Sequence, residues 1–173
     1  MAQSHGIPLT SWREVDQFDI TIDGADEVDP AFCMIKGGGG ALLREKIVAY
    51  STTMEIIVVD QSKIVAALGA FPLPVVVCPF GWESTKRHLE CAYKRNVTRR
   101  KNADGSDFFS DDGLAVLDIS FRSPLGDPHA LETEIKGIPG VLEVGIFVGL
   151  CQRLVIADES GNVEIRDAAP RKS

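Results

Sequence analysis

The feature that most constrains the fold is a strand, a glycine loop, a helix and a second strand in direct succession. Residues 18–23 (FDITID) alternate apolar and polar side chains and are rich in β-branched residues, which predicts a short strand. Four glycines at 37–40 precede a predicted helix over 41–54. Residues 55–60 (EIIVVD) are nearly all apolar and predict a strand covered on both faces. This order is the βαβ signature of a layered α/β fold.

The predicted helix carries Leu43, Ile47 and Tyr50 on one face, the pattern of a helix that packs on a sheet. Between the first strand and the glycines, residues 24–30 (GADEVDP) have the composition of a turn or loop.

The second half of the chain predicts a different arrangement, in which helices separate short strands. The elements are, in order, strand 73–78, helix 82–93, strands 97–100 and 114–119, helix 128–136 opened by Asp127 and closed by Gly137, and strand 141–148. The order β-α-β-β-α-β is the ferredoxin-like pattern. A last strand pair, 153–157 and 163–165, follows, and its first strand is placed to rejoin the α/β sheet.

We therefore expect an α/β fold, a partial Rossmann-like parallel sheet with an inserted ferredoxin-like α+β subdomain. The predicted units are an α/β catalytic domain at 1–70 and 150–167, the subdomain at 71–149 and a tail at 168–173.

Charge and composition narrow the partners of the chain. Its 173 residues include 18 Lys and Arg against 25 Asp and Glu, so the net charge is −7, which argues against a nucleic-acid partner. The longest uncharged stretch, residues 64–82, contains three prolines and cannot span a membrane as a helix. The first 15 residues lack the apolar core of a signal peptide, which favours a cytoplasmic protein. The four cysteines lack zinc-site spacing and are expected to be buried, reduced thiols.

The glycine loop is the first candidate for chemistry. Lys36 precedes the glycines, and amides exposed at the start of a helix can hold an anion or a developing oxyanion. The loop is neither a Walker loop nor a dinucleotide-binding motif, because the residues that follow it do not fit. A flexible connector is the alternative.

Acidic residues form the second candidate. Asp23, Asp26, Glu27 and Asp29 could bind a metal such as Mg²⁺, contact sugar hydroxyls or form an acid–base pair, and ordinary turn capping explains them equally well. Glu45 would tilt back toward the glycine loop, as a base for removing a proton beside a carbonyl. The alternative is a solvated acid that favours the helix dipole.

Basic residues outside the loop are less specific. Lys63 follows a predicted strand and could meet an anion, although an exposed lysine is the more common case. The run at 94–101, which includes Arg99 and Arg100, has the pattern of a solvated strand and turn.

Taken together, DGADEVDP (23–30) and KGGGGALLREK (36–46) resemble the type A ribose-5-phosphate isomerase family. The likeness continues through VVDQSK (58–63), FPLPV (71–75) and IPGVLEVGIF (138–147), and so covers nearly the whole chain.

This resemblance implies an isomerase that interconverts D-ribose 5-phosphate and D-ribulose 5-phosphate in the non-oxidative pentose phosphate pathway. It implies no metal and no organic cofactor, a sugar phosphate as the partner, no membrane, and a homodimer or homotetramer. Glu45 matches the general base that moves a proton between C1 and C2 through an enediolate. The substrate-binding positions implied are Asp23, Gly24, Ala25, Asp26, Lys36, Gly37, Gly38, Gly39 and Lys63.

Members of the family begin with a further α/β segment, whose loops contact the phosphate end of the substrate, and this chain starts near the end of that segment. We therefore expect the chain to be N-terminally truncated relative to the family, and its sheet to expose apolar surface. The alternative function is a catalytically idle remnant that acts as an interaction or oligomerisation module. A sugar-phosphate deaminase or binding domain on the same scaffold is a third possibility, against which the acidic and glycine motifs argue.

Overall fold

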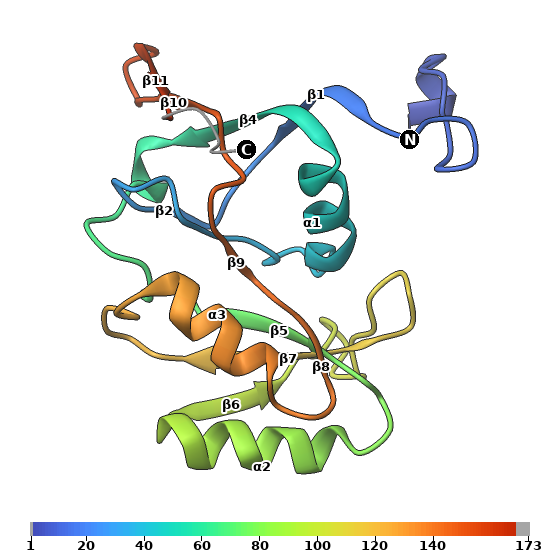
Figure 1. Cartoon of the computed structure of the whole chain (residues 1–173), viewed down its shortest axis with the longest axis vertical. Coiled ribbons are helices and arrows are strands. Elements are labelled where there is room, and N and C mark those ends of the chain that lie inside the picture. Colours follow the sequence, from blue (N-terminus) through green and yellow to red (C-terminus); the bar gives the residue numbers. More distant parts are fainter. Residues whose placement is uncertain (1, 169–173) are drawn as a thin grey trace.

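The computed structural model describes residues 2–168 and contains three sheets. Figure 1 shows a parallel sheet with helix α1 (Leu42–Tyr50) in the upper half and an antiparallel sheet with two helices in the lower half. A small sheet lies between them, and the N-terminal segment with a 3-10 helix (Ala2–His5) projects away from the upper half. Of the tail predicted at 168–173, all but Ala168 lies outside the described residues.

The upper sheet confirms the partial parallel sheet. Its strands are β1 (Phe18–Asp23), β4 (Thr52–Asp60), β10 (Arg153–Ala157) and β11 (Val163–Asp167), in the order β1-β4-β10-β11. β4 is parallel to both β1 and β10, and β11 is antiparallel to β10. The chain therefore returns to the first sheet at Arg153, as predicted, and Asp23 at the end of β1 lies beside Ile57.

The lower sheet has the predicted ferredoxin-like order. Its elements along the chain are β5 (Leu73–Val77), α2 (Trp82–Tyr93), β6 (Asn96–Arg99), β7 (Ala115–Ser120), α3 (Pro128–Lys136) and β8 (Val141–Val144). The strands pair antiparallel in the order β6-β7-β5-β8. Asp127 caps α3 by accepting hydrogen bonds from the His129 and Ala130 N–H groups, as expected of an N-cap.

The small sheet joins the two halves and corrects two predictions. β2 (Glu27–Val28), β3 (Met34–Ile35) and β9 (Ile146–Phe147) pair antiparallel in that order, so the expected loop at 24–30 contains a strand. The strand expected at 141–148 divides at Gly145 into β8 and β9. The Gly145 N–H donates to the Pro74 oxygen, and a Cβ there would lie 2.4 Å from the Lys36 oxygen. The chain can therefore change sheets only at a residue without a side chain.

Helix α1 is shorter than the sequence predicts. It ends at Tyr50 rather than at residue 54, and β4 begins at Thr52 rather than at residue 55. Two β-branched threonines at 52 and 53 favour extended backbone, and Thr52 pairs with Phe18 of β1. Strand pairing therefore prevails over continued helix.

The buried face of α1 also differs from the predicted one. Leu42 and Ala49 are buried, whereas Ile47 is exposed and Tyr50 is 78% exposed. The helix turns Leu42 toward a core that includes Phe147 of the small sheet and Val76 of the lower sheet. The spacing of apolar residues in the sequence is compatible with two buried faces of the helix, one that begins at Leu43 and one that begins at Leu42. In the structure the face that begins at Leu42 packs against the core.

The upper sheet is covered on one face only, so the prediction that β4 is covered on both faces is wrong. Val58 is exposed, as are Ile20 and Ile22 of β1, the latter at 69%. Register places these side chains on the same face, because Ile22 pairs with Ile56 and β4 alternates. The expected exposure of apolar surface on this sheet is confirmed.

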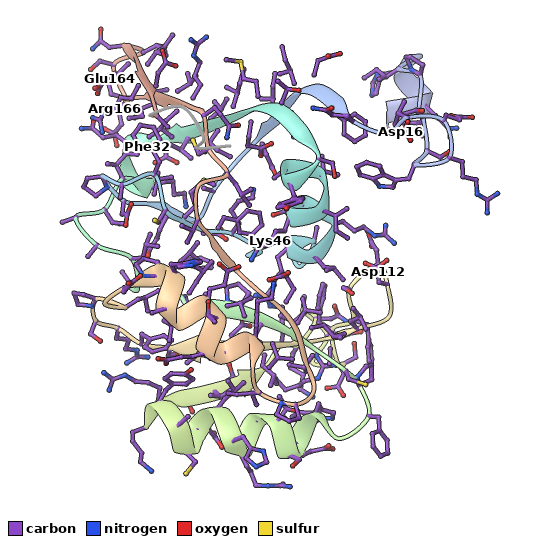
Figure 2. The ribbon with its side chains drawn as sticks, viewed as in Figure 1. Asp16, Phe32, Lys46, Asp112, Glu164 and Arg166 are labelled. Atoms are coloured by element: carbon purple, nitrogen blue, oxygen red, sulfur yellow. The ribbon has the colours of Figure 1, made fainter. Side chains whose placement is uncertain are left out.

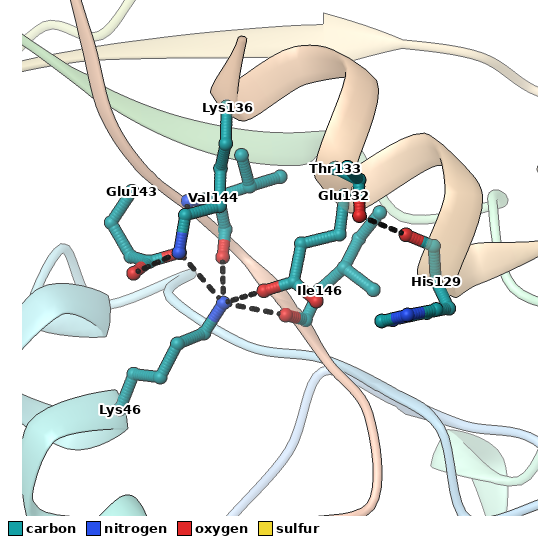
Figure 3. A network of polar contacts seen from close by, with 8 residues as sticks. All are labelled: Lys46, His129, Glu132, Thr133, Lys136, Glu143, Val144 and Ile146. Carbon is teal, nitrogen blue, oxygen red and sulfur yellow. Dashed lines mark hydrogen bonds and ion pairs between the residues drawn. The ribbon is translucent and has the colours of Figure 1, made fainter.

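A buried lysine attaches α1 to the lower half (Figures 2 and 3). Lys46 Nζ lies 2.6 Å from Glu132 Oε1 of α3 and 2.8 Å from Glu143 Oε1 of β8. It also donates to the carbonyl oxygens of Val144 and Ile146, both at 2.7 Å. We call Lys46, Glu132 and Glu143 the anchor cluster. Because Lys46 follows Glu45 directly, this cluster fixes the first turns of α1.

The cysteines are only partly as expected. Cys33 and Cys151 are buried, and burial raises the pKa of the Cys151 thiol to about 12. Cys91 is exposed, because α2 turns other residues, Thr85 and Leu89, toward the core, and Cys78, directly after β5, is half-buried. Between residues 2 and 168, none of the helices combines the length and the apolar character needed to cross a bilayer.

Candidate active site

The glycine loop connects β3 to α1 in a conformation that only glycine adopts readily. Gly37 and Gly40 have φ of +103° and +88°, and the Gly40 N–H donates to the Gly37 oxygen at 2.9 Å. A Cβ at Gly40 would lie 2.3 Å from the Phe108 ring. The run is therefore a tight, packed turn rather than a flexible connector.

Lys36 lies between this loop and the end of β1. It is only 3% exposed, and its Nζ is 2.7 Å from Asp23 Oδ2 and 3.3 Å from Glu45 Oε2. The ammonium group also donates to the Gly24 carbonyl oxygen. One buried cation is thus shared by two carboxylates that come from different elements.

Glu45 occupies the first turn of α1, as the sequence predicts, and its side chain is 24% exposed. Its Oε2 is buried and accepts no hydrogen bond from residues 2–168, although it forms the ion pair with Lys36. Burial raises the pKa of this carboxyl above 4.5, and the charges of Asp23 and Asp26 act in the same direction, against the opposing charge of Lys36. Such a carboxylate is a stronger base than a solvated one.

The acidic loop divides into two pairs. Glu27 is buried and accepts hydrogen bonds from the Gly69 and Phe71 N–H groups at 2.7 and 2.6 Å, and Asp29 accepts from the N–H groups of its own turn. Asp23 and Asp26 instead face the glycine loop. The Gly38 N–H donates to Asp26 Oδ2 at 2.8 Å.

A pocket of about 250 Å³ collects almost all of the predicted site residues. It is lined by Asp23, Gly24, Ala25, Asp26, Lys36, Gly37, Gly38, Gly39 and Glu45. Lys63 does not line it: it ends a short 3-10 helix (Gln61–Lys63) after β4 and is half-buried there. The pocket lies beyond the carboxyl end of β1, where ligands of α/β sheets bind.

The charges of the pocket suit a small polar molecule. No group of three or more His, Cys, Asp or Glu side chains in the described part of the chain is arranged to hold a metal ion. The Lys36 ammonium itself stands between Asp23 and Glu45. A carboxylate base, a buried cation and the amides of a glycine turn together can remove a proton beside a carbonyl and hold the resulting negative oxygen.

Sequence reasoning missed Arg100, which it assigned to a solvated strand and turn. Arg100 Nη1 donates to the carbonyl oxygens of Gly37 and Gly38 at 2.8 and 3.0 Å, and Arg99 is buried at 9% exposure. Two consecutive residues at the end of a strand point to opposite sides. That alternation predicts one inward arginine, which is Arg99 in the structure, and so it would not have found the contact of Arg100 with the glycine loop.

The fold and the pocket define an α/β protein with a pocket of carboxylates, a buried lysine and a glycine turn beyond the end of a parallel strand. Residues 1–161 match the family of ribose 5-phosphate isomerase A (phosphoriboisomerase A). The chain is 48% identical over 162 residues to ribose-5-phosphate isomerase A of Chloroflexus aurantiacus, which covers 93% of this chain and 67% of that protein.

Solved structures agree with this match. Ribose 5-phosphate isomerase from Plasmodium falciparum aligns with a TM-score of 0.91 at 36% identity, over 96% of this chain and 72% of that chain. A D-ribose-5-phosphate isomerase in complex with phospho-erythronic acid aligns with a TM-score of 0.89 at 33% identity and the same coverage. This chain therefore belongs to the ribose 5-phosphate isomerase A family.

Proposed function

We propose that this chain interconverts D-ribose 5-phosphate and D-ribulose 5-phosphate, with Glu45 as the base. The observation that carries the proposal is the Glu45 Oε2 atom, which is buried beside Lys36 without a hydrogen bond and lines the same pocket as the glycine turn. Family membership supports the reaction, and it does not favour the alternative of an idle interaction module.

In the proposed reaction the Glu45 carboxylate removes the proton from C2 of the open-chain aldose. The C–H electron pair forms the C1=C2 double bond, and the carbonyl electrons move onto O1, which gives an enediolate. The Glu45 carboxylic acid then returns the proton to C1, while the O2 hydroxyl proton passes to O1 and C2=O forms. The raised pKa of Glu45 lowers the energetic gap between the carboxyl and the carbon acid.

The remaining pocket residues have assigned roles in this proposal. Lys36 and the glycine amides stabilise the negative oxygen, since they are the positive groups that line the pocket. Asp23 and Asp26 contact sugar hydroxyls and assist ring opening, and Gly24 and Ala25 contact the substrate. Lys63, outside this pocket, would reach a more distant part of the sugar phosphate.

We further propose that the protein is cytoplasmic, acts as a homodimer or homotetramer, and divides into a catalytic unit at 1–70 and 150–167 and a subdomain at 71–149. The support for a catalytic unit is that every residue lining the pocket lies between Asp23 and Glu45.

The experiment is a turnover assay in which the purified chain receives D-ribose 5-phosphate and formation of D-ribulose 5-phosphate is followed. Glu45→Gln should lower kcat at least about 100-fold, because a positioned base contributes roughly 10²–10⁴ in rate. Glu83→Gln is the matched control, since Glu83 is also a first-turn helix glutamate but is exposed on α2. A folded chain without turnover, or equal activity of both variants, would contradict the proposal.

A further inference from the structure

An arginine from the lower sheet holds the glycine turn of the upper half. Arg100 directly follows β6, and its Nη1 reaches across more than sixty residues of sequence to the carbonyl oxygens of Gly37 and Gly38. All residues that line the pocket lie within Asp23–Glu45, and none comes from the lower sheet. Arg100 therefore contacts the glycine turn from outside the pocket.

The arginine is itself fixed before it meets the loop. Asp118 of β7 accepts from Arg100 Nε at 2.9 Å and also from Nη2, which is a two-pronged carboxylate pair. The Arg100 N–H donates to the Val116 oxygen, and the guanidinium lies 5.8 Å from the centre of the Phe108 ring. The guanidinium is therefore a rigid extension of the lower sheet.

This contact holds two peptide planes of the loop. The first plane is also held by the Gly40 N–H, which donates to the same Gly37 oxygen, whereas the second is held through the Gly38 oxygen by Arg100. The described peptide bonds are all trans, and in a planar trans peptide the C=O and the following N–H point in opposite directions. Because Arg100 takes the Gly37 oxygen, the Gly38 N–H is turned away from it, toward Asp26. Because Arg100 also takes the Gly38 oxygen, the Gly39 N–H is turned away as well.

The Gly39 N–H is the group left available by this arrangement. Gly39 lines the pocket, a Cβ there would meet no atom within 4 Å, and its N–H donates to no group among residues 2–168. Glycine peptides have little intrinsic preference for one orientation, so the direction of this N–H depends on groups outside the loop.

We propose that Arg100, held by Asp118, is a positioning residue that turns the Gly39 N–H into the pocket as a donor to the negatively charged oxygen of the enediolate. The inference rests on the proposed function for the identity of that oxygen. Arg100 itself touches no reacting atom: it acts through the peptide plane, and a preorganised donor of this kind stabilises charge without reorganisation during the reaction.

The kinetic test compares Arg100→Met and Arg100→Lys with Arg95→Met as control, because Arg95 directly precedes β6, as Arg100 directly follows it, and donates to Ser123 Oγ at 3.3 Å rather than to the glycine loop. Arg100→Met should lower kcat about 10- to 100-fold with KM changed less than about 3-fold, since removal of an oxyanion donor costs roughly 10²–10³ and here the donor is misaligned rather than deleted. Arg100→Lys should recover part of this loss, because it keeps the charge but not the fork.

Affinity for phospho-erythronic acid gives a second measurement. Its carboxylate carries negative charge as the enediolate does, so Arg100→Met should weaken its binding more than it raises KM for ribose 5-phosphate. Equal weakening of both, or unchanged kcat in a folded Arg100→Met protein, would overturn the proposal.

A structural measurement separates this inference from the proposed function. Amide hydrogen exchange of Gly38, followed by NMR, should accelerate at least about 10-fold in Arg100→Met and remain unchanged in Arg95→Met, since an unclamped loop opens more often. If the unmutated chain shows no turnover, the proposed function fails. The exchange measurement alone then tests whether Arg100 holds the glycine loop in place. Unchanged Gly38 exchange in Arg100→Met and Arg100→Lys overturns the inference in either case.

Discussion

The molecule contains two clusters in which one lysine contacts two carboxylates. They include consecutive residues of α1, because Glu45 belongs to the first cluster and Lys46 to the second. In the pocket, Lys36 contacts Asp23 and Glu45. In the anchor cluster, Lys46 contacts Glu132 and Glu143 (Figure 3). Both lysines are largely buried, but the pocket cluster joins neighbouring elements within Asp23–Glu45, whereas the anchor cluster joins elements that are distant in sequence.

The clusters differ in how completely the carboxylates are satisfied. Glu143 Oε1 accepts from Lys46 and from the Val144 N–H, and its Oε2 accepts from Lys136 at 3.0 Å. Burial acts to raise the pKa of Glu143, yet these donors outweigh it and the pKa lies below 4.5. For Glu45, burial acts together with the unfavourable charges of Asp23 and Asp26 and outweighs the opposing interaction with Lys36, and the pKa is raised. Burial alone therefore does not set the direction of the pKa shift; the donors and charges around each carboxylate do.

The largest effect that would test this contrast is a loss of stability in the anchor cluster. Lys46→Met should lower the free energy of unfolding by about 3–5 kcal/mol, because it removes the cation that contacts Glu132 and one oxygen of the buried Glu143, which then keeps only Lys136 as a cation. Denaturant unfolding measures this, with Lys86→Met as control, since Lys86 forms only a partly exposed pair with Glu90 worth roughly 0.3–0.5 kcal/mol. A loss below about 1 kcal/mol for Lys46→Met would refute the structural role.

The two glutamates should respond in opposite ways to the same substitution. Glu143→Gln should lower the free energy of unfolding at pH 7 by about 1.5–3 kcal/mol, the range for hydrogen bonds to a charged group, and leave kcat unchanged. Glu45→Gln should leave stability unchanged or improved, because its charged form is poorly solvated in the fold, and should remove activity. If both variants lost stability equally, the contrast would fail.

The pKa shifts predict a pH range in which the protein is folded but inactive. The base must be deprotonated, so activity falls as the pH drops through the raised pKa of Glu45, above 4.5. Glu143 has a lowered pKa, so its contribution to stability is complete above 4.5 and is lost only as the pH falls through the lower, folded value.

Activity and circular dichroism recorded over the same pH series would show this range. The loss of activity should be reversible on return to pH 7, and the dichroism should be unchanged until the pH is below 4.5. In Glu143→Gln the acid loss of stability should be less steep than in the unmutated chain. Simultaneous loss of activity and structure at one pH would contradict the separation.

The smallest expected effect concerns the helix ends. Helix α3, which lies outside the pocket, is capped by the Asp127 side chain. Helix α1 begins beside the pocket, and its N-cap residue, Ala41, offers no side-chain hydrogen bond. Asp127→Ala should lower the free energy of unfolding by about 1 kcal/mol with kcat unchanged, the usual cost of losing an N-cap. Thermal unfolding checks this, and a change in kcat would link α3 to the site.

Local features of the fold could be predicted because their signals lie within a few residues of one another. The strand at 18–23, the helix at 82–93 and the Asp127 cap were each read from side chains inside the element. The helix predicted to run to residue 54 was wrong, because pairing with β1 takes the chain into β4 from Thr52. The residues of a predicted helix do not show whether its last turn will instead pair with a strand from another part of the chain.

In the candidate site, too, local features could be predicted and contacts between distant elements could not. All nine residues that line the pocket fall within Asp23–Glu45. The aspartates, the glycine loop and Glu45 were predicted because a strand end, a loop and a helix start must lie close together, whereas Gly24 and Ala25 were implied by the family resemblance. Arg100 was misjudged, because the packing of the end of β6 on the glycine loop is not specified by any local pattern. The role of Lys63, at the end of the 3-10 helix after β4, stays a prediction.

The sequence by itself determined which groups are available for chemistry: a carboxylate at the start of a helix, a lysine before four glycines, and two aspartates after a strand. Only the tertiary structure decided the pKa of each carboxylate and the orientation of each backbone amide. The direction of a carboxyl pKa depends on which donors and charges from other elements surround it, and the direction of a glycine amide depends on what holds its neighbouring carbonyl. The contacts of Lys46 with Glu143 and of Arg100 with the glycine turn join residues far apart in the chain, and so they exist only once the sheets have packed.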